Sequence, residues 1–220
     1  MKKTSHYKLG SSDDIIIYHP NSKFYFIPIP KNGSTTIYQN FSQIGWSYYK
    51  LYYHDQMKDR IPIIVYRDPI ERWFSGFTQD YKPESFPEGI EDTKVAANFF
   101  KQGFFGLHSQ LQQWYLKKYK IYNAVFIKFT KSFIDIPKIF KHNIKDADKI
   151  ISEINHGSVK YQGIEDIIKN HYYSDPTNQE NLHRYLKDDL EFYKTINFID
   201  PNRILQNYQL WDSYKRTESI

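Results

Sequence analysis

The chain has 220 residues, 40% of them hydrophobic and 25% charged, which suits one globular α/β domain. Its net charge of +5 and isoelectric point of about 9.0 favour an anionic ligand or polymer. The absence of cysteine excludes disulfides and cysteine-based metal sites. No apolar run approaches the roughly 20 residues of a membrane span, and no apolar core follows Met1–Tyr7. We therefore expect a soluble, cytoplasmic protein.

The first predicted elements are two strands and a helix. Asp14–Tyr18 and Lys23–Ile29 are rich in β-branched and aromatic residues, and a turn-forming His-Pro-Asn-Ser segment separates them. Ile37, Phe41 and Ile44 follow at helical spacing and predict a helix over Thr35–Trp46. The expected order is strand, glycine-containing turn, helix.

A second strand-to-helix junction follows. After an extended run at Ser47–His54, the apolar segment Ile61–Tyr66 predicts a buried strand of a parallel sheet. Asp68 is a suitable cap for a helix that begins at Pro69.

The rest of the chain continues the alternation. Another buried strand is expected at Tyr122–Phe129. Helices are expected near residues 107–118, 132–142, 147–154, 163–171, 178–194 and 201–214. The pattern predicts an α/β fold in which a single domain, residues 1–220, has a mostly parallel central sheet flanked by helices.

The residues from Lys31 to Thr36 have the composition of a phosphate-binding turn. Backbone N–H groups at a helix start favour an anion, Gly33 allows close approach, and Lys31 adds positive charge. A plain helix cap beside a solvated lysine fits the same residues. Because Lys31 precedes Gly33, the segment lacks the Gly-Lys-Ser/Thr order of nucleotide triphosphatases.

Arg67 is expected at the carboxyl end of a buried strand, where open α/β sheets bind ligands. Its guanidinium suits a phosphate, and Ser75 follows eight residues later on the next helix. The alternative is a structural junction in which Arg67 or Arg72 pairs with Asp68 or Glu71.

The two segments together resemble a known family. Ile29–Thr35 is similar to the 5′-phosphosulfate loop of sulfotransferases that use PAPS (3′-phosphoadenosine 5′-phosphosulfate), and Val65–Phe77 is similar to their 3′-phosphate segment. Weaker likenesses at Leu107–Gln112, Ile154–Ser158 and Tyr185–Phe192 point to the carbohydrate branch (Golgi-type, sulfotransferase family 2). The resemblance implies a P-loop-like sulfotransferase fold.

The resemblance also implies a role for each matching residue. Lys31 would contact the 5′-phosphosulfate and stabilise the leaving group, and Arg67 and Ser75 would hold the 3′-phosphate. The rest of the loop would hold the 5′-phosphate: Asn32, Gly33, Ser34, Thr35 and Thr36. The donor would be PAPS, the product PAP (the 3′,5′-bisphosphate), and no metal is expected.

Sulfuryl transfer to a hydroxyl requires a general base, and histidine is the usual one near neutral pH. We expect His54, between the two donor segments, to be this base. His108 and the carboxylate of Asp55 are the alternatives.

The expected acceptor is a glycan or glycoside hydroxyl, with no nucleic acid as partner. Two other functions fit the sequence. One is a PAP-binding homologue without activity, and the other is a nucleic-acid-binding domain that uses basic and aromatic residues.

Overall fold

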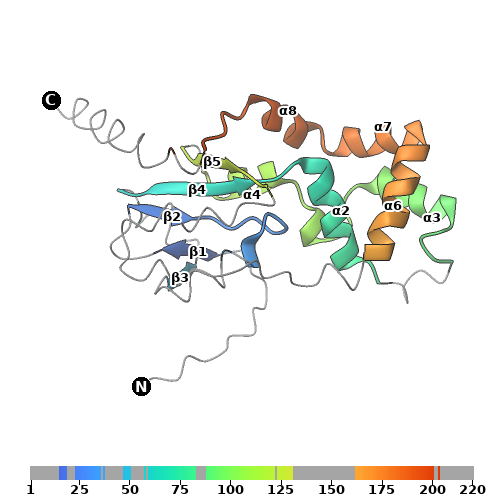
Figure 1. Cartoon of the computed structure of the whole chain (residues 1–220), viewed down its shortest axis with the longest axis horizontal. Coiled ribbons are helices and arrows are strands. Elements are labelled where there is room, and N and C mark those ends of the chain that lie inside the picture. Colours follow the sequence, from blue (N-terminus) through green and yellow to red (C-terminus); the bar gives the residue numbers. More distant parts are fainter. Residues whose placement is uncertain are drawn as a thin grey trace, which may run out of the picture.

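The structure is a computed structural model that describes residues 15–18, 23–35, 37, 47–50, 57, 59–82, 88–121, 123–130, 162–200 and 203. They form one α/β domain. A sheet occupies one side and most of the helices gather on the other, with α8 lying over the sheet side near β5 (Figure 1).

The sheet has five strands in the described part of the chain, in the order β3-β1-β2-β4-β5. They are β1 (Ile15–Tyr18), β2 (Phe24–Phe26), β3 (Ser47–Lys50), β4 (Ile61–Tyr66) and β5 (Val125–Lys128). β2, β4 and β5 are parallel neighbours, whereas β1 is antiparallel to both β2 and β3. The sheet is therefore mixed, and the expectation of a mostly parallel sheet is wrong for the β1–β3 half. The short connection between β1 and β2 explains this, because a parallel pair needs a crossover of a dozen or more residues.

The helices are α2 (Pro69–Asp80), α3 (Thr93–Gln102), α4 (Gln112–Lys118), α6 (Gln162–Ser174), α7 (Pro176–Tyr185) and α8 (Lys187–Thr195), with a short 3-10 helix, η4 (Leu107–Ser109). α2 begins where expected, and the Asp68 carboxylate accepts from the N–H groups of Ile70 and Glu71 at 3.0 Å. α3 was not predicted from the sequence.

Two expected helices are each divided. The segment 107–118 is broken between η4 and α4, and 178–194 is broken at Leu186, between α7 and α8. The helices expected at 132–142 and 147–154 lie outside the described residues, as does that at 201–214 apart from residue 203.

The larger helical core is aromatic. Trp73 of α2 is fully buried and stacks on Phe77 and on Phe100 of α3, with ring centroids 5.6 and 5.3 Å apart. A second core joins the sheet to α4 through residues such as Tyr66 and Tyr115. The first core packs α2 against α3, α6 and α7, and the second packs α4 against the sheet. None of the helices that the structure describes is long and apolar enough to cross a membrane.

Candidate functional site

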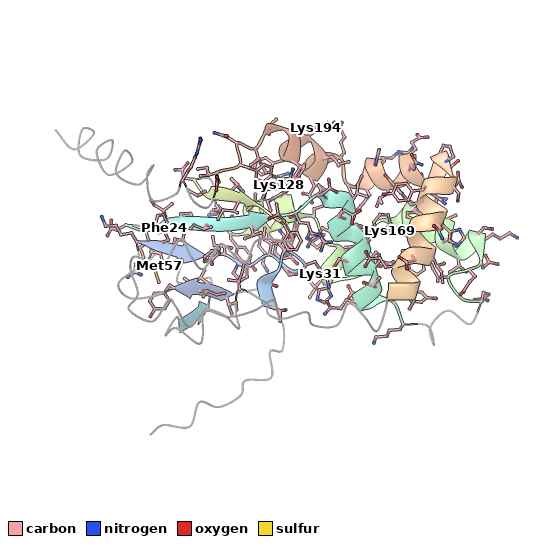
Figure 2. All side chains as sticks on the ribbon, in the orientation of Figure 1. Phe24, Lys31, Met57, Lys128, Lys169 and Lys194 are labelled. Carbon is pink, nitrogen blue, oxygen red and sulfur yellow. The ribbon has the colours of Figure 1, made fainter. Side chains whose placement is uncertain are left out.

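The two segments singled out in the sequence lie side by side. The Lys31 turn follows β2 and Arg67 follows β4, and because these strands are parallel neighbours their carboxyl ends meet at one edge of the sheet. Arg67 Nη1 donates to the Lys31 carbonyl at 3.3 Å. Figure 2 shows Lys31 at the junction between the sheet and the helices. The fold thus brings both segments into one site.

The turn has the backbone of a tight loop that enters a helix. Lys31 and Gly33 both have positive φ angles, 68° and 76°, which glycine adopts at little cost and lysine rarely does. Ser34, Thr35 and Ile37 are helical, and Ile37 donates to the Gly33 carbonyl. Within the described part of the chain, the N–H groups of Gly33 and Ser34 have no acceptor. The expected role of Thr36 falls on a residue outside that part.

Asn32 lies beneath the turn and not on its open side. Its side chain is 1% exposed, and Nδ2 donates to the Val65 carbonyl at 2.8 Å and to Gln112 Oε1 at 2.6 Å. The Asn32 side chain therefore anchors the loop to β4 and α4. Gly33 and Ser34, by contrast, are partly exposed and Thr35 is exposed.

Gln112 is the residue that links these parts, and sequence reasoning gave it no role. Besides Asn32, its side chain binds Arg67, donating to the carbonyl and accepting from the N–H group. The backbone N–H groups of Gln112 and Gln113 both donate to the buried Asp189 carboxylate of α8 at 2.7 Å. Asp189 thus caps α4 from a helix that is distant in sequence. Burial raises the pKa of the Asp189 carboxyl group. No local pattern in the sequence indicates this connection.

Arg72 is a buried structural arginine. It is 1% exposed, and it donates to the Pro30 carbonyl at 3.0 Å and to the Gln110 carbonyl at 2.6 Å. It therefore holds the Lys31 turn against the segment that carries His108. Neither Arg67 nor Arg72 pairs with Asp68 or Glu71, because Asp68 caps α2 and Glu71 binds Lys169 at 3.0 Å.

Lys31 and Arg67 are half-buried cations, and in the described part of the chain neither has a carboxylate within ion-pair distance. Burial, followed by repulsion from Arg67, lowers the pKa of Lys31 to about 8. Burial also lowers the pKa of Arg67, against the opposing effect of Glu71. Partly desolvated positive charges without a counterion favour a bound anion.

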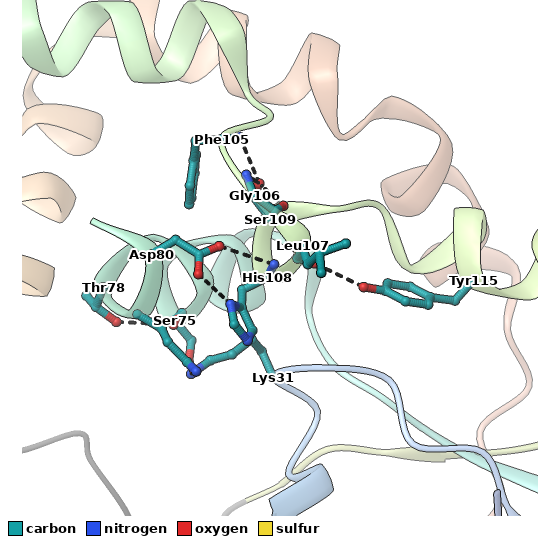
Figure 3. A network of polar contacts seen from close by, with 11 residues as sticks. Lys31, Ser75, Thr78, Asp80, Phe105, Gly106, Leu107, His108, Ser109 and Tyr115 are labelled. Carbon is teal, nitrogen blue, oxygen red and sulfur yellow. Dashed lines mark hydrogen bonds and ion pairs between the residues drawn. The ribbon is translucent and has the colours of Figure 1, made fainter. Parts of the chain in front are cut away.

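Ser75 lies on the same side of α2 as Gln79, one helical turn away. Gln79 accepts a hydrogen bond from Lys31 Nζ at 2.8 Å. The Ser75 hydroxyl makes no hydrogen bond with any residue that the structure describes. Figure 3 shows Ser75 on α2 near the side chains of Lys31 and His108.

His108 is held by α2. Its Nδ1 lies 2.5 Å from Asp80 Oδ1, and its backbone N–H donates to Asp80 Oδ2 at 3.3 Å. The free edge of the ring is directed toward the Lys31 side chain (Figure 3). His54 and Asp55, the other base candidates, lie outside the described residues.

In comparisons with known proteins, the chain matched no protein-family model, no curated protein and no solved structure.

Proposed function

We propose that this chain is a PAPS-dependent sulfotransferase that transfers a sulfuryl group to a carbohydrate hydroxyl. The observation that carries the proposal is the pair Lys31 and Arg67, half-buried cations without a carboxylate partner among the described residues, at the shared carboxyl edge of β2 and β4. The likeness of both segments to PAPS-binding segments selects this donor among phosphate-containing ligands. The proposal includes a P-loop-like sulfotransferase fold.

The donor's two phosphate groups are assigned to two parts of the site. The N–H groups of Gly33 and Ser34, which have no acceptor among the described residues, suit the 5′-phosphosulfate together with the charge of Lys31. Arg67 and the unbonded hydroxyl of Ser75 suit the 3′-phosphate, which distinguishes PAPS from ordinary adenine nucleotides.

The reaction is an in-line displacement at sulfur. The acceptor oxygen forms the new S–O bond while the bond from sulfur to the bridging oxygen of the 5′-phosphate breaks, and its electron pair stays on that oxygen. Lys31 stabilises the negative charge that develops there. The acceptor's hydroxyl proton passes to a general base and then to water. The products are the sulfate ester and PAP.

Of the three base candidates, His108 is the one that lies among the described residues, and its position suits the role. It lies next to Lys31 (Figure 3), and its Nε2 makes no hydrogen bond in the described part of the chain. A base beside the group that stabilises the leaving oxygen is in position to receive the acceptor's proton.

The proposal is tested by thermal-shift titration with PAP, AMP and ATP. A ligand that binds only the folded chain raises its melting temperature, and we expect PAP to do so at concentrations at which AMP does not. Equal stabilisation by all nucleotides, or none by PAP, contradicts the proposal. PAP binding without turnover on a panel of glycans, glycosides and peptide tyrosines would instead indicate an inactive homologue.

A further inference from the structure

We propose that Asp80 is a positioning residue that fixes the tautomer and orientation of His108, leaving Nε2 free to accept the proton of the acceptor hydroxyl. This inference rests on the proposed function for its catalytic meaning. The pairing of the two side chains can be tested in the protein without substrate.

One carboxylate holds His108 at two points. Asp80 Oδ1 faces the ring nitrogen Nδ1 at 2.5 Å, and Oδ2 accepts from the backbone N–H of the same residue at 3.3 Å (Figure 3). A side-chain contact alone would leave the ring free to swing about its backbone. The second bond fixes the backbone as well, so Asp80 determines both the position and the direction of the imidazole.

Two glycines allow the segment that carries His108 to pack closely against α2. A Cβ atom on Gly106 would overlap the Asp80 carboxylate, and a Cβ atom on Gly76 would overlap the backbone carbonyl of His108. Both positions therefore have no room for a side chain in this arrangement. The segment that carries His108 lies directly against α2, and this contact leaves little freedom for the ring.

The chemistry of the pair sets the tautomer. An ionised carboxylate only accepts hydrogen bonds, so a neutral imidazole bound to it through Nδ1 carries its single proton there. The lone pair then lies on Nε2, at the edge directed toward Lys31 (Figure 3). When Nε2 takes a proton, the positive ring stays beside the Asp80 carboxylate, which stabilises it.

The last turn of α2 contacts both the Lys31 and the His108 side chains. Gln79 binds Lys31 Nζ at 2.8 Å, and the next residue, Asp80, binds His108. Gln79 and Asp80 are consecutive residues of α2, so they hold Lys31 and His108 at a fixed distance from each other.

The first test is the tautomer of His108 in the free protein, read from the long-range proton–nitrogen NMR spectrum of its imidazole, with His108→Gln identifying the signals. We expect the proton on Nδ1 in the parent protein. In Asp80→Asn we expect the population to shift toward the Nε2–H form. A parent protein that carries the proton on Nε2 overturns the proposal, and that result needs no variant to fold.

The second test is kinetic. We expect Asp80→Asn to lower kcat about 100-fold or more, whereas the KM for PAPS and the Kd for PAP stay within about threefold, because Asp80 acts through His108 and not on the donor. Asp80→Glu, which keeps the carboxylate, should recover part of the loss, and Asp188→Asn on the exposed side of α8 is the control. Equal loss in the Asn and Glu variants, or a matching loss of PAP affinity, assigns Asp80 a merely structural role.

These results separate the two proposals. If PAP fails to bind but the Nδ1–H tautomer is found, the proposed function fails and the Asp80–His108 pairing stands. If PAP binds and turnover occurs while His108 has the other tautomer, the function stands and the pairing fails.

Discussion

The side-chain amide of Gln112 pairs with the backbone of Arg67 in both directions. Its Nε2 donates to the Arg67 carbonyl at 2.9 Å, and its Oε1 accepts from the Arg67 N–H at 3.2 Å. The same oxygen accepts from Asn32 at 2.6 Å. Gln112 is fully buried, so these backbone groups have no water to replace it. One amide therefore holds the end of β4 and the Lys31 turn together.

We expect Gln112→Leu to destabilise the chain by about 3 kcal/mol, because it leaves the buried N–H and carbonyl groups of Arg67 unsatisfied. Chemical unfolding monitored by fluorescence gives the free energy. The control is Gln102→Leu, on the exposed surface of α3, which should change stability by no more than about 0.5 kcal/mol. Equal effects of the two substitutions would contradict the role of Gln112.

We expect Lys31 to make PAP binding depend on pH. Its pKa is lowered from 10.5 to about 8 by burial and by Arg67, so in the folded chain it loses its proton above about pH 8. PAP affinity should therefore fall as the pH rises from 7 to 9.5, measured by calorimetry. Lys31→Arg keeps its charge throughout this range and should show a much flatter profile.

The lowered pKa of Lys31 also affects the folding stability of the protein without ligand. Between pH 8 and the ordinary lysine value of 10.5 the unfolded chain holds a proton on Lys31 that the folded chain has lost, so the Lys31 contribution makes the fold more stable as the pH rises. The difference in stability between the parent and Lys31→Met should change with pH in this window. A constant difference would contradict the lowered pKa.

Gly76 is expected to tolerate no side chain. In Gly76→Ala the new methyl group meets the His108 backbone, so we expect a loss of roughly 2–3 kcal/mol in stability and a larger fall in kcat than in PAP affinity. Gly163 of α6 is the matched control, because a Cβ atom there meets nothing within 4 Å. Gly163→Ala should be neutral or stabilise the chain by up to about 1 kcal/mol. Thermal and chemical unfolding of the Gly76→Ala and Gly163→Ala variants measure the difference in stability.

Arg67 is expected to select for the 3′-phosphate. Arg67→Gln removes a charge-assisted contact, so we expect PAP affinity to fall roughly 30-fold while the weak affinity for AMP changes little. Competition binding against a fluorescent PAP analogue gives both constants. Arg184→Gln, on the exposed surface of α7, is the control. A parallel loss for PAP and AMP would place Arg67 at the 5′ end of the nucleotide.

Sequence patterns predict the parts of this fold that local chemistry determines. The β4 strand, the Asp68 cap and the proline start of α2 were all expected, and each depends on neighbouring residues. The breaks at residues 110–111 and at Leu186 were missed, since apolar periodicity runs through both. α3 was also missed, although Asp92 caps it and Gly103 ends it with a φ of 68°.

The candidate site also has a part that the sequence predicts and a part that it does not. The Lys31 turn and Arg67 could be placed together because each follows a strand. The roles of Gln112, Asp189 and Asp80 could not be predicted, because each binds a partner that is distant in sequence and no periodic pattern marks such a contact.

The cap that Asp189 places on the start of α4 becomes available late during synthesis. Asp189 follows Gln112 by 77 residues, so at about 5–20 residues per second the start of α4 waits roughly 4–15 s for its cap to be made. The residues of the sheet edge and of the Lys31 turn are synthesised earlier, as is Gln112. A nascent chain would therefore already contain the Lys31 turn, Arg67 and the Asp80–His108 contact, and the start of α4 would receive its cap only when α8 docks.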